Sequence, residues 1–243
     1  MLVIGLDAAS QLKKFGYAIG TIAHSKLSIQ QAGILGDEPD VIYSIIVTAL
    51  HAAPNAVIAI DAPLGWPASL GKSLFSHLAG DKLSVETNDL FRRHTDTVVI
   101  ETTDKTPLEI GADKIARAAH TALAVLNQIR ERSGLALPLL WSAKSQSAGA
   151  IEVYPAATLK MHSAPAVGYK EPNQRPVREE IAHNLRGQIP GLDRYVSSKA
   201  DIFDACLCML AAHDFVNGVC RTPRADEMER AKKEGWIWVR EKG

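Results

Sequence analysis

The stretch NAVIAIDAPLGWP, Asn55–Pro67, decides the fold and raises the main question about function. Its residues Ala56–Asp61 are apolar up to the last one and predict a buried strand. The strand ends at a carboxylate, Asp61, which Ala-Pro follows at once. A charged group near a core costs several kcal/mol unless it is paired, bound to a metal or hydrated. Asp61 is therefore a candidate functional residue.

The residues before this stretch predict three antiparallel strands and a helix. LVIGL at 2–6 ends at Asp7, and FGYAIGTIA and KLSIQQAGIL follow after short polar breaks with partial period-two alternation. DVIYSIIVTALHAA then has apolar residues at helical spacing. A strand, a helix and a strand at this spacing imply a right-handed crossover, so the strand of Asp61 should run parallel to an earlier strand.

The residues after Pro67 are mostly helical in pattern up to a short fifth strand in GAIEVYPAATL and a closing apolar helix in SSKADIFDACLCMLAAHDFVNG. We expect one α/β domain over residues 1–243, with a five-stranded mixed sheet and helices on both faces. Its expected parts are a core of 1–67 and 149–216, a helical insertion of 68–148 that roofs the site, and a tail of 217–243.

Acidic residues stand at the ends of these expected elements. Asp7, Asp61 and Glu152 each lie near one end of an apolar segment, and Asp201 and Asp204 lie three apart in the first turn of the closing helix. The ends of neighbouring parallel strands meet in one crevice. Carboxylates gathered there repel one another unless cations lie between them, and Mg²⁺ or Mn²⁺ prefers such oxygen ligands.

Each acidic residue also has a structural interpretation. Asp201 could be a favourable charge at a helix N-terminus, and Asp7 could close a turn. Glu152 could pair with an arginine such as Arg175 or Arg178. Asp61 has the weakest structural alternative, and a single metal site accounts for all five residues more economically.

Several motifs together resemble a known superfamily. IGLDAAS, FGYAIG, AIDAPLGWP, EVYP and DIFDACLCMLAA occur in this order and resemble the ribonuclease H-like superfamily, and more narrowly the family called domain of unknown function 429, predicted ribonuclease H-like nucleases. The resemblance implies a ribonuclease H-like sheet. It also implies that the acid of the first strand is Asp7, that of the fourth strand Asp61, and the closing acidic pair Asp201 and Asp204. Glu152 matches the narrower family's E-V-x-P pattern.

The insertion carries two further patterns of that family, in RHTDTVV and DKTPLEIGADKIARAA. By this resemblance alone, Arg93, Thr95 and Asp96 are candidates to bind substrate. The alternative is a network at a helix terminus, in which Asp96 holds Arg93 and Thr95 is a cap. The sequence favours this alternative.

Composition limits the class of partner. The 243 residues include 27 basic and 27 acidic side chains, and 47% of the residues are hydrophobic. Duplex-DNA binding usually shows as a basic surplus, which this chain lacks. The three cysteines are typical of buried thiols in a reducing compartment. Neither a signal peptide nor a membrane span is recognisable. We expect a cytoplasmic protein without membrane contact, and the sequence leaves a homodimer open.

The expected function is hydrolysis of phosphodiester bonds with Mg²⁺ or Mn²⁺. Asp7, Asp61 and Asp204 would bind the metal, and Asp201 and Glu152 would complete the catalytic site. A nucleic acid, single-stranded, or a small nucleotide would reconcile this activity with a net charge of zero. Two alternatives stay open. One is a phosphotransferase or ATPase of the actin and sugar-kinase type, whose fold is duplicated, and the other is a non-catalytic binding protein that keeps the fold.

Overall fold

The computed structural model describes residues 1–111, 113–171 and 173–241. Its strands are β1 (Leu2–Asp7), β2 (Gly16–Ala23), β3 (Lys26–Ile34), β4 (Ala56–Asp61) and β5 (Gly149–Glu152). They form one sheet in the order β3-β2-β1-β4-β5 among the described residues. β1, β2 and β3 are antiparallel neighbours, whereas β4 and β5 run parallel to β1. The predicted five-stranded mixed sheet is confirmed.

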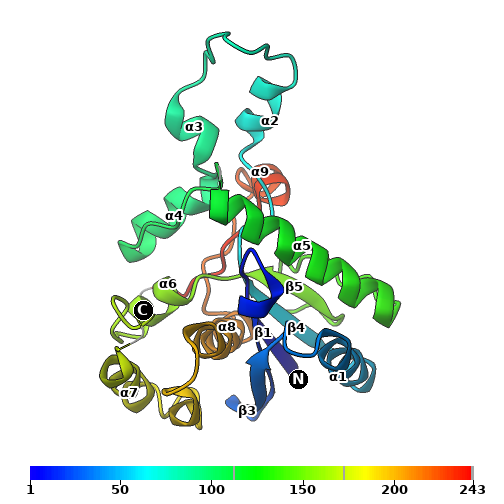
Figure 1. Ribbon diagram of the computed structural model, residues 1–243, viewed down its shortest axis with the longest axis vertical. Coiled ribbons are helices and arrows are strands. Elements are labelled where there is room, and N and C mark those ends of the chain that lie inside the picture. The colour runs from blue at the N-terminus through cyan, green and yellow to red at the C-terminus, as the bar shows by residue number, and fades with distance from the viewer. Residues whose placement is uncertain (112, 172, 242–243) are drawn as a thin grey trace.

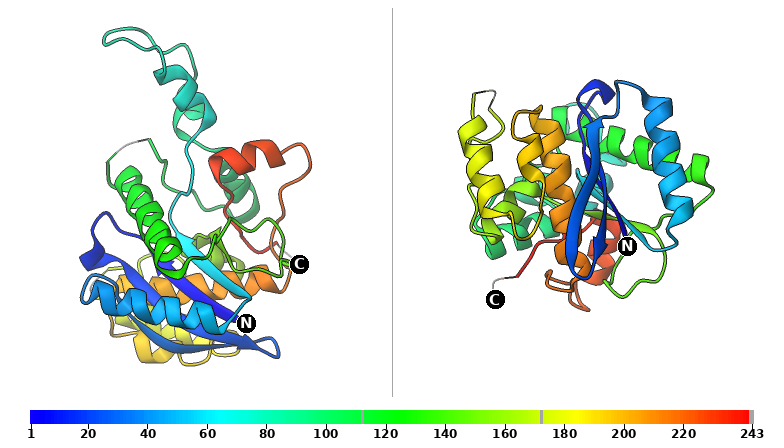
Figure 2. Two further views of the ribbon diagram at one scale, coloured as in Figure 1. Left: turned by 90° about the vertical axis from the view of Figure 1, so that its right-hand side faces the viewer. Right: turned by 90° about the horizontal axis from the view of Figure 1, so that it is seen from below.

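Helices cover both faces of this sheet, as predicted. The helices are α1 (Pro39–Ala52), α2 (Ala68–Leu74), α3 (Thr87–Phe91), α4 (His94–Thr103), α5 (Asp113–Ser133), α6 (Pro155–Met161), α7 (Arg175–Asn184), α8 (Ala200–Val216) and α9 (Met228–Glu234). α1 and α5 lie against one face, and α8, with α6 and α7 beside it, lies against the other (Figures 1 and 2). No helix among the described residues is both long and apolar enough to cross a membrane.

Period-two alternation along β1 divides its side chains between the two faces. Leu2, Ile4 and Leu6 pack with α1 and α5, whereas Val3 packs in the cluster that contains α8. Asp7 has the same parity as Val3, and it is aligned with Asp61 of β4 in the parallel register. The two aspartates therefore end neighbouring strands on the face that α8 covers.

The segment between β4 and β5 contains α2, α3, α4 and α5 and contributes no named strand among the described residues. α2 and α3 belong to an arm that projects away from the sheet (Figure 1). α5 instead lies beside α1, where Val125, Leu126 and Ile129 join the core on that face. The insertion therefore does not only cover the site, as expected, because its longest helix, α5, packs against the sheet and forms part of the core.

α8 is the central helix, and two glycines let it approach the sheet. It is buried around nearly its whole circumference, as expected for a helix that is apolar on all sides. A Cβ atom at Gly5 of β1 would collide with the carbonyl oxygen of Ala205, and one at Gly16 of β2 would collide with that of Asp201. The backbone of α8 thus touches the strands directly.

Gly5→Ala should force α8 away from β1 and lower the free energy of unfolding by about 1–3 kcal/mol or more, as overpacked cores do. The matched control is Gly71→Ala in α2, where an added Cβ meets no atom within 4 Å. That substitution should leave stability unchanged or raise it by up to about 1 kcal/mol. Urea unfolding of both variants measures the difference, and equal effects would contradict the close packing of α8.

Candidate metal centre

Three carboxylates from different elements meet at one end of the sheet. Asp7 ends β1, Asp61 ends β4, and Asp204 lies in the first turns of α8. Each offers an oxygen, and these oxygens lie within 4.8 Å of one another. The structure thus brings together the three residues that the sequence suggested as metal ligands.

Asp204 is the most enclosed of the three, with 1% of its surface exposed. Its Oδ2 forms an ion pair with the ammonium of Lys170, whereas its Oδ1 accepts no hydrogen bond from any described residue. Asp214, a second buried aspartate of α8, differs sharply, because it bonds His162 at 2.7 Å and Arg240 at 3.0 Å. Buried polar groups normally have partners. One oxygen of Asp204 is therefore left without a partner, whereas both oxygens of Asp214 are paired.

Burial and mutual repulsion raise the pKa values of the three carboxyl groups. Burial is the main cause for each, and the charge of Asp204 adds to the rise for Asp7. Burial likewise raises the pKa of Asp61 to about 7, although Lys170 opposes the rise. The cluster therefore holds negative charge with difficulty unless a cation lies beside it.

Lys170, which sequence patterns do not single out, supplies part of that compensation. Its ammonium forms an ion pair with Asp204 Oδ2. Burial opposes the charge of Lys170, but Asp204, Asp61 and Asp7 together raise its pKa above the ordinary value. Lys170 stands in the segment between α6 and α7, which has no periodicity to indicate where a side chain points. Only the tertiary structure identifies this residue.

Asp201 lies outside the three-carboxylate group, although it is one turn from Asp204. Its charge still acts at the site, because it contributes to the raised pKa values of Asp7 and Asp204. Its side chain is only partly buried. Of the closing acidic pair, Asp204 therefore belongs to the carboxylate cluster and Asp201 lies beside it.

Glu152 also lies outside the group, because its register differs. It aligns with Ile60 of β4 and not with Asp61, so it has the opposite parity. Its partner is Arg93, whose Nη2 lies 2.7 Å from Oε1, and it accepts a bond from the backbone N–H of Leu64 at 3.0 Å. The suggested pairing with Arg175 or Arg178 does not occur.

Arg93 is fully buried, and the protein occupies all five of its N–H donors. Nε and Nη2 donate to the two oxygens of Asp96 at 3.2 and 2.8 Å. Nη1 donates to Glu152 Oε2 at 3.0 Å and to the Glu234 carbonyl at 3.1 Å, and Nη2 pairs with Glu152 Oε1. Burial opposes the charge, but Glu152 and Asp96 raise the pKa of Arg93. No donor is left over for a substrate.

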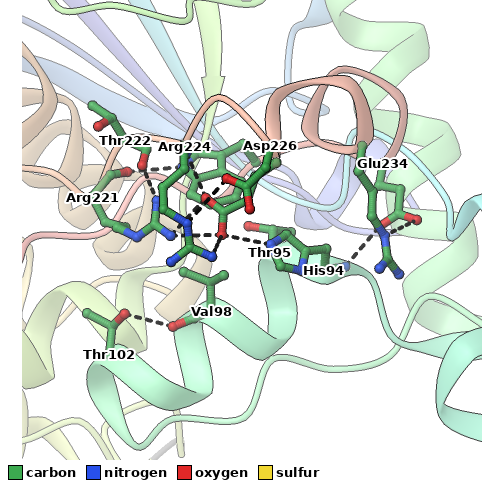
Figure 3. Close-up of polar contacts among 12 residues, drawn as sticks. His94, Thr95, Val98, Thr102, Arg221, Thr222, Arg224, Asp226 and Glu234 are labelled. Carbon is green, nitrogen blue, oxygen red and sulfur yellow. Dashed lines mark hydrogen bonds and ion pairs between the residues drawn. The ribbon is translucent and has the colours of Figure 1, made fainter.

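Thr95 and Asp96 are buried as well and belong to the same network. Asp96 holds Arg93, as the structural interpretation expected, but the Thr95 hydroxyl is no cap and accepts the backbone N–H of Ile237 at 2.8 Å. The C-terminal segment adds further contacts at the start of α4, where Glu234 accepts the His94 N–H at 2.8 Å (Figure 3). These hydrogen bonds connect the insertion to the C-terminal segment. A role in substrate binding remains a prediction from the resemblance, and the geometry does not favour it.

A cavity of about 430 Å³ connects the carboxylate cluster with this network. Asp7, Asp61 and Lys170 of the cluster line it, and so do Arg93 and Glu152 of the network. The insertion contributes residues 106–108 and the first turns of α5. The cavity makes the cluster accessible to a small ligand or to one unit of a polymer.

Replacing Arg93 with lysine should destabilise the protein, because an ammonium cannot make five bonds in the guanidinium geometry. Each buried group left without a partner costs about 1–3 kcal/mol of unfolding free energy. Arg92→Lys is the matched control, since Arg92 forms an exposed pair with Glu109 worth about 0–1 kcal/mol. Chemical denaturation of both variants measures the difference in their free energies of unfolding. Unchanged stability of Arg93→Lys would contradict the structural role.

The raised pKa of Asp61 predicts how stability varies with pH in the absence of divalent metal. The carboxyl has a pKa of about 7 when folded and about 3.9 in an unfolded chain. Its protonated form therefore favours folding below pH 4, and this stabilisation is lost as the pH rises through 7. With a chelator, wild type should melt at a lower temperature at about pH 8 than at about pH 5, and Asp61→Asn should show a smaller drop. Asp40→Asn, which changes an exposed residue, should show the full decrease in melting temperature. An equal decrease in Asp61→Asn would refute the raised pKa of Asp61.

Comparison with known proteins gives the family. Two structures of RuvC from Thermus thermophilus resemble this fold. One is in complex with a Holliday junction substrate and is 12% identical, with 88% of this chain and 94% of that chain covered and a TM-score of 0.38. The other is 10% identical, with 90% and 97% covered and a TM-score of 0.41. At this level neither structure bears on the activity of this chain, and no curated protein sequence matches it significantly. The sequence model described as "Protein of unknown function (DUF429)" matches residues 5–229, so the chain belongs to the DUF429 family.

Proposed function

We propose that this protein hydrolyses phosphodiester bonds with a divalent cation, Mg²⁺ or Mn²⁺, held by Asp7, Asp61 and Asp204. The observation that carries the proposal is the meeting of three carboxylates, among which the buried Asp204 is paired only through Oδ2, with the ammonium of Lys170. A purely structural cluster would be expected to pair every buried carboxylate oxygen, as both oxygens of Asp214 on the same helix are paired.

The donor set suits a hard cation. Three aspartates offer only oxygen atoms, and Mg²⁺ and Mn²⁺ favour carboxylate oxygens. Histidine and cysteine, which softer metals prefer, are absent from the group. When bound, such a cation would lower the pKa of a water molecule and neutralise charge on the leaving oxygen.

The other residues of the site would then have separate roles. Lys170 compensates the carboxylate charge when no metal is present, and on metal binding its ammonium is free to meet a substrate phosphate. Asp201 adds negative potential from the next turn of α8, and we assign it no direct ligand role. Glu152 positions the loop after β4 through Leu64 and is itself held by Arg93.

A nucleotide-clamping phosphotransferase is not favoured. Such proteins place the nucleotide between two copies of the fold, and the described residues form one five-stranded sheet. A non-catalytic role is not favoured either, because repulsion within an unused cluster would cost stability. Like charges about 4 Å apart cost about 1–4 kcal/mol between the dielectric of water and that of a protein surface. We further propose that the substrate is a nucleic acid and that the protein forms a homodimer.

Asp204→Asn and Asp214→Asn form a matched pair that tests the proposal, since both remove a buried charge from α8. Without metal, Asp204→Asn should melt at the temperature of wild type or higher, because relief of the repulsion offsets the lost ion pair and Lys170 keeps Asp7 and Asp61 as neighbouring charges. The variant should lose the stabilisation by Mn²⁺ together with any cleavage of a single-stranded oligonucleotide. Asp214→Asn leaves Arg240 and His162 short of a partner and should lose about 1–3 kcal/mol of stability.

Thermal melting with and without Mn²⁺ is the measurement, with cleavage followed on the same samples. At a metal concentration of about 100 times the dissociation constant, wild type should gain about 2.7 kcal/mol. Asp214→Asn should keep this gain on its lower baseline. A destabilised Asp204→Asn variant with a normal response to Mn²⁺ would disprove the metal site.

A further inference from the structure

The cavity beside the carboxylates has a second, apolar part that hydrolysis at the carboxylates does not use. Pro107 and Leu108 of the insertion, Ile115 and Ala118 of α5, and Tyr154 at the start of α6 line it. A cavity of about 430 Å³ is in the usual range for small-molecule sites, roughly 300–1,000 Å³. The cavity therefore has room for one ring system next to a phosphate group.

Tyr154 gives this wall a fixed aromatic surface. It is the residue before Pro155, where α6 begins, and its hydroxyl donates to the carbonyl oxygen of Thr106 at 3.3 Å. Tyr154 and Asp61 line the same cavity, and the pKa of Tyr154 is raised by burial and by the charge of Asp61. A group held at Asp61 is thus within reach of the ring.

We propose that the apolar wall receives the base of a single unpaired nucleotide, whose phosphate lies at Asp7, Asp61 and Asp204. This inference rests on the proposed phosphodiester hydrolysis and specifies its substrate. Every base offers a π-face to an aromatic side chain, so stacking on Tyr154 would tolerate different sequences. Arg93 has no free donor, so of the two described cations that line the cavity Lys170 is the one that would face the phosphate.

A stacked duplex does not fit this arrangement. Asp7 and Asp61 line the cavity, and little of the cluster reaches the outer surface, since Asp7 and Asp204 are only 8% and 1% exposed. A scissile phosphate must therefore enter the cavity together with its nucleotide, and taking a base out of a stack costs least when it is already unpaired. The net charge of zero also disfavours a duplex substrate, since affinity for duplex backbones comes mainly from basic residues.

Binding of fluorescein-labelled oligothymidylate, measured by anisotropy with Ca²⁺ in place of Mg²⁺ to suppress turnover, tests the inference. Tyr154→Ala should weaken binding of the single strand about 5- to 150-fold, the usual effect of losing one stacked base. Tyr154→Phe keeps the ring and should bind like wild type. Leu108→Asp changes an exposed side chain that the fold does not need and should also weaken binding. Leu78→Ala, an exposed apolar residue of the arm that does not line the cavity, is the control.

Further ligands separate the outcomes. The same strand in a duplex, or with abasic sites in place of its bases, should bind much more weakly than the intact single strand. Competition by thymidine 5′-monophosphate as strong as that by the strand would identify a free nucleotide, and weak competition would identify a nucleotide within a strand. Wild-type affinity of both Tyr154→Ala and Leu108→Asp, or equal binding of the duplex, would overturn the inference. Calorimetric titration of Mn²⁺ is the independent readout: a wild-type protein that binds no Mn²⁺ would overturn the proposed hydrolysis itself.

Discussion

The direct contact between the backbone of α8 and strands β1 and β2 determines where the acidic residues lie. Gly5 and Gly16 leave no side chain between helix and sheet, so α8 reaches the strands closely enough to bring Asp204 to the ends of β1 and β4. The same contact buries most of α8 and removes Asp204 from water. Packing that stabilises the fold therefore creates a cluster of carboxylates that repel one another, and the ion pair with Lys170 offsets only part of this cost.

The sheet and part of the site could be predicted from sequence because they follow from short periodicities. The apolar run of Ala56–Asp61 has the bounds of β4, and a crossover helix requires β4 to lie parallel to an earlier strand. Asp7 and Asp61 then end neighbouring parallel strands, and their convergence follows. Asp201 and Asp204 could not be distinguished, because both lie in the first turns of one helix and only its rotation against the sheet selects between them.

The remaining site residues depend on register and on contacts between distant segments, which periodicity does not encode. Glu152 ends a strand as the two aspartates do, but its alignment with Ile60 turns it toward Arg93. Arg93 is linked to partners up to 141 positions away. Lys170 comes from a segment without regular structure, and nothing in its neighbours distinguishes it from a solvated lysine. Pairing partners of this kind become visible only when the chain is folded.

The most direct test of the metal centre is the anomalous diffraction of Mn²⁺ in a crystal of this protein. The account predicts an anomalous peak within coordination distance of the carboxylate oxygens of Asp7, Asp61 and Asp204, with the ammonium of Lys170 moved away from Asp204. A crystal that contains Mn²⁺ in its solution, shows no peak among these three residues and keeps Lys170 paired with Asp204 would contradict it.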